Sequence, residues 1–432
     1  MRTLPPPVAA DTTTAGQYAP AAAPRTVPAE HMSDPVLAQA LFAAWSGDRA
    51  VVIASPPGAG KTRRVTHLAA QLTHRAGLRV AVAAQTRAQS LDVASRIAAL
   101  GCPVTLIGKR DTTRPGDLHP DAVWSTSETA LRISTGVVVA TTARWRYVDP
   151  ATYTCDVLVI EEAWQSTFAD FGALGGLAEQ FVMVGDPGQI DPVVTGDTTR
   201  WDRSPTGPHR PAPEAFTAAF PGLATQLRLD TTWRLGPVTT ALIQPVFYPD
   251  LPFTSARPPR HVTLHGTPLP ELTATALDLP GGTSDPNLPA AAAALARELL
   301  DGGRLHVDGG PDRPLTERDI AVITPHVDQS TAAATRLTDR PGVLIGTINQ
   351  VQGSERDAVI AIHPLAGRRE VAEHNAAAGR LCVALSRHRA HLHVLTDAET
   401  PTVLRAALTA SPRSRALTAQ RDVLAALAPT AA

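Results

Sequence analysis

A short glycine-rich segment carries the first residues whose types and spacing could do chemistry. Ser55-Pro-Pro-Gly-Ala-Gly-Lys-Thr62 follows an apolar run and opens a helical pattern. Its two glycines let backbone N–H groups turn inward around an anion, and the following helix N-terminus adds a positive dipole end. The segment therefore predicts a phosphate loop that binds ATP, although Ser55 stands where the full pattern has Gly. The predicted nucleotide contacts are Pro57, Gly58, Ala59, Gly60, Lys61, Thr62 and Arg63.

Lysine is almost absent from the chain. Among 39 basic residues only Lys61 and Lys109 are lysines. An ammonium is a compact point charge that a guanidinium does not replace. The lysine inside the loop therefore indicates a chemical requirement, and we predict that Lys61 binds the β- and γ-phosphates while the Thr62 hydroxyl ligates Mg²⁺.

Acidic and amide residues follow two further apolar runs. Glu161 and Glu162 come directly after Val157–Ile160, and Gln189 follows Phe181–Val184 through a Gly-Asp turn. Strand ends of a parallel sheet face the ligand crevice. We therefore predict that Glu161 holds hydrated Mg²⁺, that Glu162 orients the attacking water, and that Gln189 reaches the γ-phosphate or this water.

At this point the sequence resembles a superfamily 1 helicase of the branch with Gly-Pro-Pro-Gly-x-Gly-Lys-Thr and Gly-Asp-x-x-Gln-Leu-Pro-Pro motifs. Gly185 to Pro192 matches the second motif, with Asp191 in place of a proline. Four segments of the second half resemble later motifs of the family, in order: Leu229-Asp-Thr-Thr-Trp-Arg234, Thr324-Pro-His-Val-Asp-Gln329, Gly346-Thr-Ile-Asn-Gln-Val-Gln-Gly-Ser-Glu355 and Val383-Ala-Leu-Ser-Arg387.

The resemblance implies roles for residues that spacing alone does not assign. Arg234 and Arg387 would reach the γ-phosphate from a second lobe, Gly353 and Glu355 would border the nucleotide, and Gln39 would read the adenine. The residues implied to bind nucleic-acid phosphates are Thr86, Thr141, Thr142 and Thr347. Trp124, Trp145 and Trp164 are alternative platforms for base stacking or, as most tryptophans are, core residues.

The elements that must position these residues alternate regularly. Val65, Leu68, Ala69 and Leu72 mark one face of a helix that Gly77 ends. The predicted strands, apolar on both faces as in a buried parallel sheet, are Ala50–Ala54, Arg79–Ala84, Val104–Ile107, Gly136–Thr141, Asp156–Ile160, Phe181–Val184, Asp319–Thr324, Gly342–Gly346, Ala358–Ile362 and Leu392–Leu395.

This alternation predicts an α/β fold of two tandem RecA-like P-loop domains, each a parallel sheet flanked by helices, with ATP in the cleft between them. We expect a Pro/Ala-rich disordered leader at 1–30, a first lobe at 31–222, a second lobe at 223–405 and a C-terminal helix or tail at 406–432. Pro249–Pro289 is weakly patterned, and we expect it on the surface.

Composition sets the remaining expectations. The net charge is −1, and the three cysteines have no metal-ligand spacing. No apolar run is long enough to span a bilayer, and we expect a monomer in the cytoplasm. The leading hypothesis is an ATP-driven translocase or helicase on single-stranded DNA or RNA, with 5′ to 3′ polarity implied by the resemblance. The alternative is an ATP-switched interaction or defence-type ATPase that acts on a protein partner; a P-loop kinase would not explain the later motifs.

Overall fold

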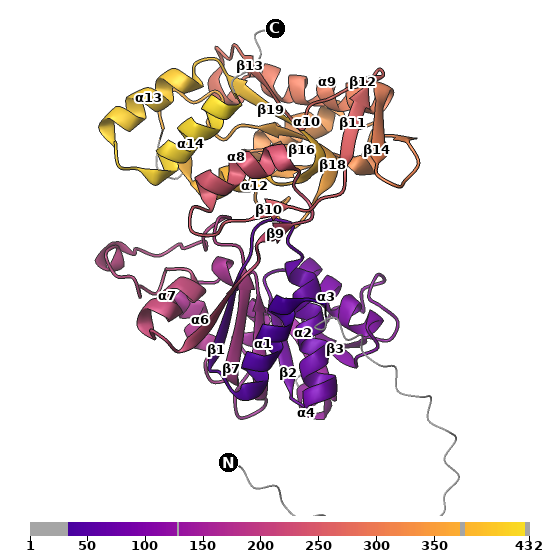
Figure 1. Ribbon diagram of the computed structural model, residues 1–432, viewed down its shortest axis with the longest axis vertical. Coiled ribbons are helices and arrows are strands. Elements are labelled where there is room, and N and C mark those ends of the chain that lie inside the picture. The colour runs from indigo at the N-terminus through magenta and orange to yellow at the C-terminus, as the bar shows by residue number, and fades with distance from the viewer. Residues whose placement is uncertain (1–32, 128, 372–375, 428–432) are drawn as a thin grey trace, which may run out of the picture.

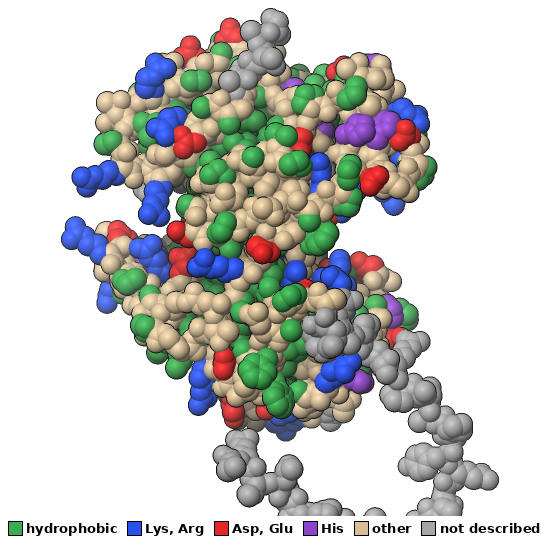
Figure 2. Space-filling model, viewed as in Figure 1, with side chains coloured by type: hydrophobic (Ala, Val, Ile, Leu, Met, Phe, Trp, Pro, Cys, Tyr) green, Lys and Arg blue, Asp and Glu red, His purple; other side chains and the backbone are tan. Residues whose placement is uncertain are grey.

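Two lobes stand end to end in the computed structural model, which describes residues 33–127, 129–371 and 376–427 (Figure 1). The predicted leader at 1–30 lies outside the described residues. Of the described residues, the first lobe holds those up to Arg228 and the second lobe holds the rest (Figure 1). A narrow waist separates the two lobes (Figure 2). Lys and Arg side chains gather along this waist.

The first lobe is built on an eight-stranded, wholly parallel sheet. Its strand order is β4-β3-β5-β2-β6-β7-β1-β8. The bounds are β1 (Ala50–Ala54), β2 (Val80–Ala84), β3 (Val104–Ile107), β4 (Val123–Ser125), β5 (Val137–Thr141), β6 (Cys155–Glu161), β7 (Ala178–Gly185) and β8 (Ala224–Arg228). The six strands predicted for this lobe are confirmed, because continuous β-branched runs are the pattern of a sheet buried on both faces.

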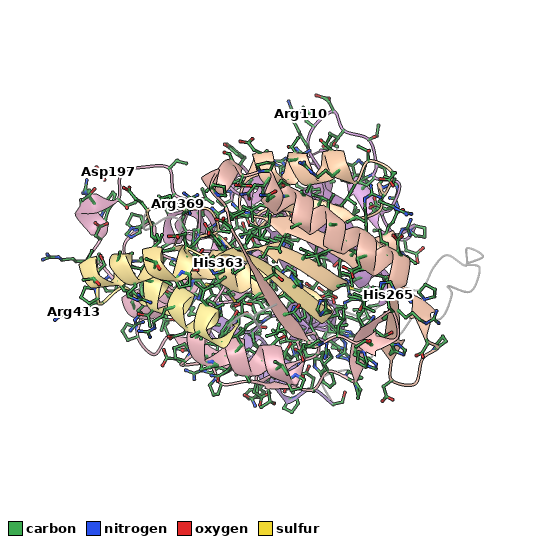
Figure 3. All side chains as sticks on the ribbon, turned by 90° about the horizontal axis from the view of Figure 1, so that it is seen from above. Arg110, Asp197, His265, His363, Arg369 and Arg413 are labelled. Carbon is green, nitrogen blue, oxygen red and sulfur yellow. The ribbon has the colours of Figure 1, made fainter. Side chains whose placement is uncertain are left out.

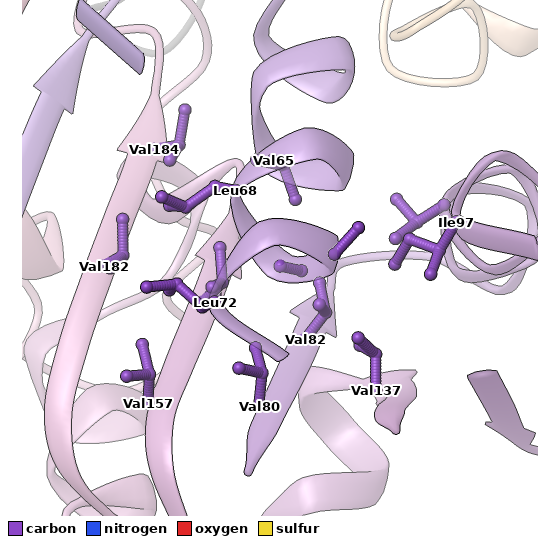
Figure 4. Close-up of a cluster of buried hydrophobic side chains, with 14 of the residues drawn as sticks. Val65, Leu68, Leu72, Val80, Val82, Ile97, Val137, Val157, Val182 and Val184 are labelled. Atoms are coloured by element: carbon purple, nitrogen blue, oxygen red, sulfur yellow. The ribbon is translucent and has the colours of Figure 1, made fainter. Parts of the chain in front are cut away.

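Helices cover both faces of this sheet. One face carries α1 (Pro35–Ser46), α2 (Lys61–Ala76) and α3 (Arg87–Ala99); the other carries α4 (Thr129–Ile133), α5 (Thr142–Trp145), α6 (Phe168–Leu174) and α7 (Ala212–Ala219). The predicted face of α2 packs on the strands, as Leu68 and Leu72 against Val80 and Val182 illustrate (Figure 4). Gly77 ends α2 in the left-handed conformation, as predicted. Each such buried side chain contributes about 1.5–3 kcal/mol.

The second lobe repeats the design with a five-stranded parallel sheet ordered β13-β19-β18-β16-β17. Its strands are β13 (Leu272–Leu277), β16 (Ile320–Thr324), β17 (Leu344–Thr347), β18 (Arg356–Ile362) and β19 (His388–Asp397). The helices are α8 (Pro237–Phe247), α9 (Asn287–Gly302), α10 (Val327–Arg336), α12 (Ala378–Leu385), α13 (Thr400–Ala410) and α14 (Arg415–Ala426). The two similar parallel sheets agree with the predicted pair of RecA-like lobes.

The Pro-rich stretch 249–289 is more ordered than expected. It supplies β13, which pairs with β19, and β11 (Arg260–Leu264), which pairs with β14 (Gly303–Val307) in a small antiparallel sheet completed by β12 (Thr267–Pro268) and β15 (Arg313–Pro314). Both β11 and β13 carry exposed residues, so their patterns lack the continuous apolar run of a central strand.

The boundaries between the parts also differ from the expected ones. Strand β8 pairs with β1, so the first sheet continues beyond residue 222 and we place the end of the first lobe after Arg228. The chain then crosses through the short parallel pair β9 (Thr231–Thr232) and β10 (Thr254–Ser255). Helix α13 spans the expected boundary at 405, and α14 packs on α8 and α12 with Val423 in their core. Within the described part of the chain, no helix is long and apolar enough to cross a membrane.

Candidate nucleotide site between the two lobes

A pocket of about 730 Å³ lies between the lobes and brings together residues from both halves of the chain. The sequence-predicted residues that line it are Gly58, Ala59, Gly60, Lys61, Thr62, Arg63, Glu161, Glu162, Gln189, Arg234, Gly353, Glu355 and Arg387. Nearly all candidates for nucleotide, metal and catalytic roles therefore face one space, although they lie on six separate segments of the chain.

The phosphate loop is held in a left-handed turn that opens α2. Gly58 and Gly60 have φ of +71° and +83°, a region that favours glycine. Helix α2 begins at Lys61, so its unpaired N–H groups point into the pocket. Arg64 fixes the turn, because its Nη1 donates to the Ala59 carbonyl at 2.5 Å while its Nε lies 2.8 Å from the Asp34 carboxylate.

Thr62 and Glu161 lie side by side at the end of β6. The Thr62 hydroxyl donates to Glu161 Oε1 at 2.5 Å. Burial, with a smaller contribution from neighbouring Glu162, raises the pKa of Glu161 to about 7 although the Thr62 hydrogen bond opposes the shift. A carboxyl group with such a shifted pKa in a cleft is a candidate for a functional role. The pair thus offers two oxygen ligands to a hard cation such as Mg²⁺.

Glu162 occupies a strained position. Its φ of +54° is left-handed, which is costly for a residue with a side chain and is typical of functional sites. The strain turns the carboxylate toward Lys61, whose Nζ lies 3.9 Å from Glu162 Oε1. The arrangement fits the predicted water-orienting role.

Asp186 connects the phosphate loop with the turn after β7. Its Oδ2 accepts from Gln189 Nε2 at 2.7 Å and from Lys61 Nζ at 3.4 Å. The Asp186 carboxylate is buried, and the hydrogen bonds from these two donors offset the cost of its desolvation. Gln189 is thereby held at the pocket wall beside the lysine.

The second lobe supplies a cluster of arginines. Arg387 is only 3% exposed, and burial together with nearby Arg234 lowers its pKa to about 10, so it remains charged at neutral pH. Arg234 donates from Nη1 to the Ser386 carbonyl at 3.2 Å and pairs with Glu355, which also pairs with Arg389. Burial alone would raise the pKa of Glu355, but Arg234 and Arg389 outweigh it and the pKa is lowered. Glu355 thus pairs with both Arg234 and Arg389, which line the same pocket as Arg387.

Several residues of the pocket were not identified from the sequence, and Trp233 and Arg257 are two of them. Trp233 presents a 58% exposed indole to the pocket and is a candidate surface for an aromatic base. Arg257 also lines the pocket; its side chain is only 8% exposed and lies 3.6 Å from Glu271. The motif around Arg234 could have pointed to Trp233, whereas Arg257 comes from the Pro-rich stretch and carried no signal.

Gln39 does not face the nucleotide pocket. Leu37, Ala40, Ala43 and Ala44 form the buried face of α1, so Gln39 falls on its exposed side. It is not among the residues that line the pocket. The expected adenine contact of Gln39 therefore finds no support in the lining of this pocket and stays a prediction. Pro57, a predicted nucleotide contact, does not line the pocket either. Its carbonyl accepts a hydrogen bond from the Thr232 hydroxyl at 2.7 Å.

The four threonines expected to bind nucleic-acid phosphates are dispersed. Thr86 caps α3 and lines the nucleotide pocket. Thr142 is buried and donates to the Ala84 carbonyl at 3.3 Å, and Thr347 donates to Gln350 Oε1 at 3.1 Å. Only Thr141, which caps α5, lines a second pocket described below. The hydroxyl protons of Thr142 and Thr347 are thus used inside the fold, and the expected contacts of these two threonines with nucleic acid stay predictions.

The second pocket, of about 930 Å³, lies at the carboxyl ends of β2, β3, β4 and β5. Among the described residues that line it, the charged ones are all cationic: Arg87, Lys109, Arg110 and Arg144. We call it the basic groove. Arg110 projects from the periphery of the molecule (Figure 3). Trp124 and Tyr147 add aromatic surface, and Tyr147 is 76% exposed.

The other two tryptophans are core residues. The Trp145 indole donates to the Val82 carbonyl at 2.9 Å, and that of Trp164 donates to Glu214 Oε1 at 3.2 Å. Both side chains are buried in the core under the first sheet. The stacking alternative is therefore wrong for Trp145 and Trp164 and stays open for Trp124.

Comparisons with known proteins agree with two related lobes. Models of the AAA domain match residues 38–202 and 294–399, one match in each lobe. No curated protein matches the sequence.

Similar solved structures include a PRRSV helicase with 19% identity and a TM-score of 0.44, covering 84% of this chain and 54% of that one. Arterivirus nonstructural protein 10, also a helicase, has 16% identity and a TM-score of 0.47, covering 85% of this chain and 64% of that one. Its complex with DNA has 15% identity and a TM-score of 0.42, with coverages of 85% and 65%. The chain thus spans between half and two thirds of the length of these structures. The AAA-domain matches fall one on each lobe, and both lobes contribute residues to the shared pocket.

Proposed function

We propose that this protein is an ATP-dependent nucleic-acid translocase or helicase, which hydrolyses ATP between its lobes to move along single-stranded DNA or RNA. The observation that carries the proposal is the joint pocket, in which Lys61 of the first lobe and Arg387 of the second line the same space. Hydrolysis would then depend on the relative position of the lobes, which is what a motor requires.

The residues present fit a triphosphate with a divalent cation. Within the described residues, Glu161 Oε2, Arg387 Nε and both Nε and Nη1 of Arg257 are buried and have no hydrogen-bond partner. Buried polar groups normally have partners, so this set calls for a ligand with both anionic oxygens and a cation. Gly58 and Gly60 hold the turn in the left-handed conformation, and the N–H groups at the start of α2 have no partner within the helix.

Residues of both lobes would take part in the hydrolysis of ATP. Lys61 and the N-terminus of α2 would hold the phosphates, while Thr62 and Glu161 would hold Mg²⁺. When bound, Mg²⁺ neutralises charge on the phosphoryl oxygens. Glu162 would orient the attacking water, and Gln189 would support the γ-phosphate. Arg234 and Arg387 would stabilise the charge of the loose transition state, a role that can be worth ~10³–10⁵ in rate.

The basic groove supports a single-stranded track on the first lobe. Cations bind backbone phosphates without reading sequence, and aromatic faces stack on bases of any identity. Arg87, Arg144, Trp124 and Tyr147 meet both requirements in one place. The groove adjoins the nucleotide pocket, because Ala88 of α3 lines both. We further propose that the protein works as a monomer in the cytoplasm and moves 5′ to 3′.

The test is the ATP hydrolysis rate with single-stranded DNA, with single-stranded RNA and without polymer, using Glu162→Gln as the blank. We expect a rate that rises with at least one polymer. A rate well above the blank but indifferent to both polymers would favour the ATP-switched interaction protein instead. A wild-type rate equal to the blank would overturn the proposal.

A further inference from the structure

Tyr248 is a fully buried polar side chain that the proposed reaction does not use. It follows the last residue of α8 in the second lobe and is 2% exposed. Its ring packs edge-on against Phe253 at a centroid distance of 5.3 Å. Burial, reinforced by nearby Asp186, raises the pKa of Tyr248 well above 10, so the hydroxyl keeps its proton and must donate it to a partner.

The partner lies in the other lobe. The Tyr248 hydroxyl donates to Asp186 Oδ1 at 2.6 Å and lies 3.4 Å from Cys382 Sγ. A bond of this length to a buried carboxylate is among the stronger hydrogen bonds of proteins. The end of α8 is therefore tied directly to the turn after β7.

The turn is shaped to receive the ring. A β-carbon on Gly188 would lie 2.4 Å from the Tyr248 ring, so only glycine leaves room for it. On the other side, a β-carbon on Gly379 of α12 would lie 2.2 Å from the Gln189 carbonyl. The segment that holds Asp186 and Gln189 is thus enclosed between α8 and α12 of the second lobe.

The same carboxylate reaches the phosphate loop. Oδ1 of Asp186 takes the tyrosine proton, while Oδ2 takes Gln189 Nε2 and Lys61 Nζ. Movement of the second lobe would shift Tyr248 and, through Asp186, the lysine and glutamine that face the γ-phosphate. Conversely, a phosphate that attracts Lys61 would weaken its 3.4 Å contact with Asp186.

We infer that Tyr248 is a positioning residue, which couples the second lobe to the catalytic turn through its hydrogen bond to Asp186. The inference rests on the proposed function, because it explains how a movement of the second lobe would change ATP turnover. Tyr248 itself does not line the nucleotide pocket. Its substitution should therefore change kcat rather than the binding of nucleotide.

The experiment compares the full-length wild type, Tyr248→Phe, Asp186→Asn and the double variant. We expect Tyr248→Phe to lower kcat with saturating single-stranded DNA by about ten-fold, the usual effect of losing one hydrogen bond to a charged group. The KM for ATP and the affinity for a non-hydrolysable ATP analogue should stay near wild type, whereas the thermal midpoint should fall, because the buried Asp186 carboxylate loses a donor. In the Asp186→Asn background, Tyr248→Phe should cause little further loss, because its partner is already altered.

The control is Phe253→Leu, which disturbs the packing of the ring without touching Asp186. It should lower the thermal midpoint and leave the DNA stimulation in place. An unchanged kcat in Tyr248→Phe, or the same fold loss in both backgrounds, would overturn the coupling role. So would a Tyr248→Phe variant whose nucleotide affinity falls in proportion to kcat, or a Phe253→Leu variant that loses as much kcat as Tyr248→Phe does. A wild type that hydrolyses no ATP would instead overturn the proposed function, and this inference with it.

Discussion

Arg234 lies directly against Gly58 of the phosphate loop, since a β-carbon on Gly58 would stand 2.3 Å from Cβ of Arg234. The segment around the arginine is fastened to the loop. Trp233 N–H donates to the Gly58 carbonyl at 3.0 Å, and the Thr232 hydroxyl donates to the Pro57 carbonyl at 2.7 Å. Thr232 and Trp233, where the chain passes from the first lobe to the second, are therefore held in place by the loop that would bind the phosphates.

This contact predicts that Gly58→Ala abolishes ATP hydrolysis. The methyl group would collide with Arg234, and the φ of +71° would be strained by any side chain. The ATPase rate should fall to that of the Glu162→Gln blank.

The matched control is Gly77→Ala at the end of α2. Its φ of +68° carries the same backbone strain, but nothing lies within 4 Å of the added methyl. This variant should lose about 1 kcal/mol of stability and keep its ATPase rate. Equal activity in the two variants would show that the contact with Arg234 is unimportant.

Glu161→Gln should stabilise the nucleotide-free protein at alkaline pH. The folded-state pKa of Glu161 is about 7, above its ordinary value of 4.5, because burial penalises the carboxylate. The folded protein therefore binds this proton more tightly than the unfolded chain, and its stability falls as pH rises through this window. Replacing the carboxylate removes a cost of the order of 1–3 kcal/mol that is fully present above pH 7.

Urea unfolding at pH 5.5 and pH 8.5 would test this, with Glu179→Gln as the control for an exposed carboxylate on β7. The gain from Glu161→Gln should be larger at pH 8.5, while its ATPase activity should be lost. A gain that is the same at both pH values would contradict the shifted pKa.

Tyr147→Ala should weaken the binding of single-stranded nucleic acid. The ring is 76% exposed at the edge of the basic groove, so its removal should leave stability near wild type. Loss of one stacking contact, about 1–3 kcal/mol, corresponds to a roughly ten-fold or greater loss of affinity. Fluorescence anisotropy at one fixed salt concentration measures it, because the salt dependence of phosphate contacts is steep.

Phe42→Ala is the matched control, because Phe42 is a similarly exposed aromatic residue on α1 and lines neither pocket. Its affinity should equal that of the wild type. If both variants bind like wild type, the strand does not stack on Tyr147.

The central strands and the phosphate loop could be predicted from sequence because their signals are local. Continuous apolar runs such as Val157–Ile160 are readable only as buried strands, and Gly58-Ala-Gly-Lys61 has few other uses. Strand β13 was missed because it pairs on one side only, so its exposed threonines and alanines carry no such run.

Side-chain direction was not readable from the sequence. Gln39 has a suitable spacing before the loop, but the apolar face of α1 turns it outward. Trp145 and Trp164 resemble stacking residues by type alone, whereas their ring N–H groups find partners inside the first lobe. The link from Tyr248 to Asp186 depends on how the lobes dock, which no local pattern encodes.

The most direct test of the role of the second lobe measures both nucleotide affinity and ATP turnover in Arg387→Ala. Arg387→Lys is the variant that retains the charge. Both quantities are measured with Mg²⁺ and saturating single-stranded DNA. We predict that Arg387→Ala binds a non-hydrolysable ATP analogue within about three-fold of wild type while its turnover falls by about 10³ or more. Turnover that persists, or affinity and turnover that fall in equal proportion, would contradict the claim that the second lobe completes the site.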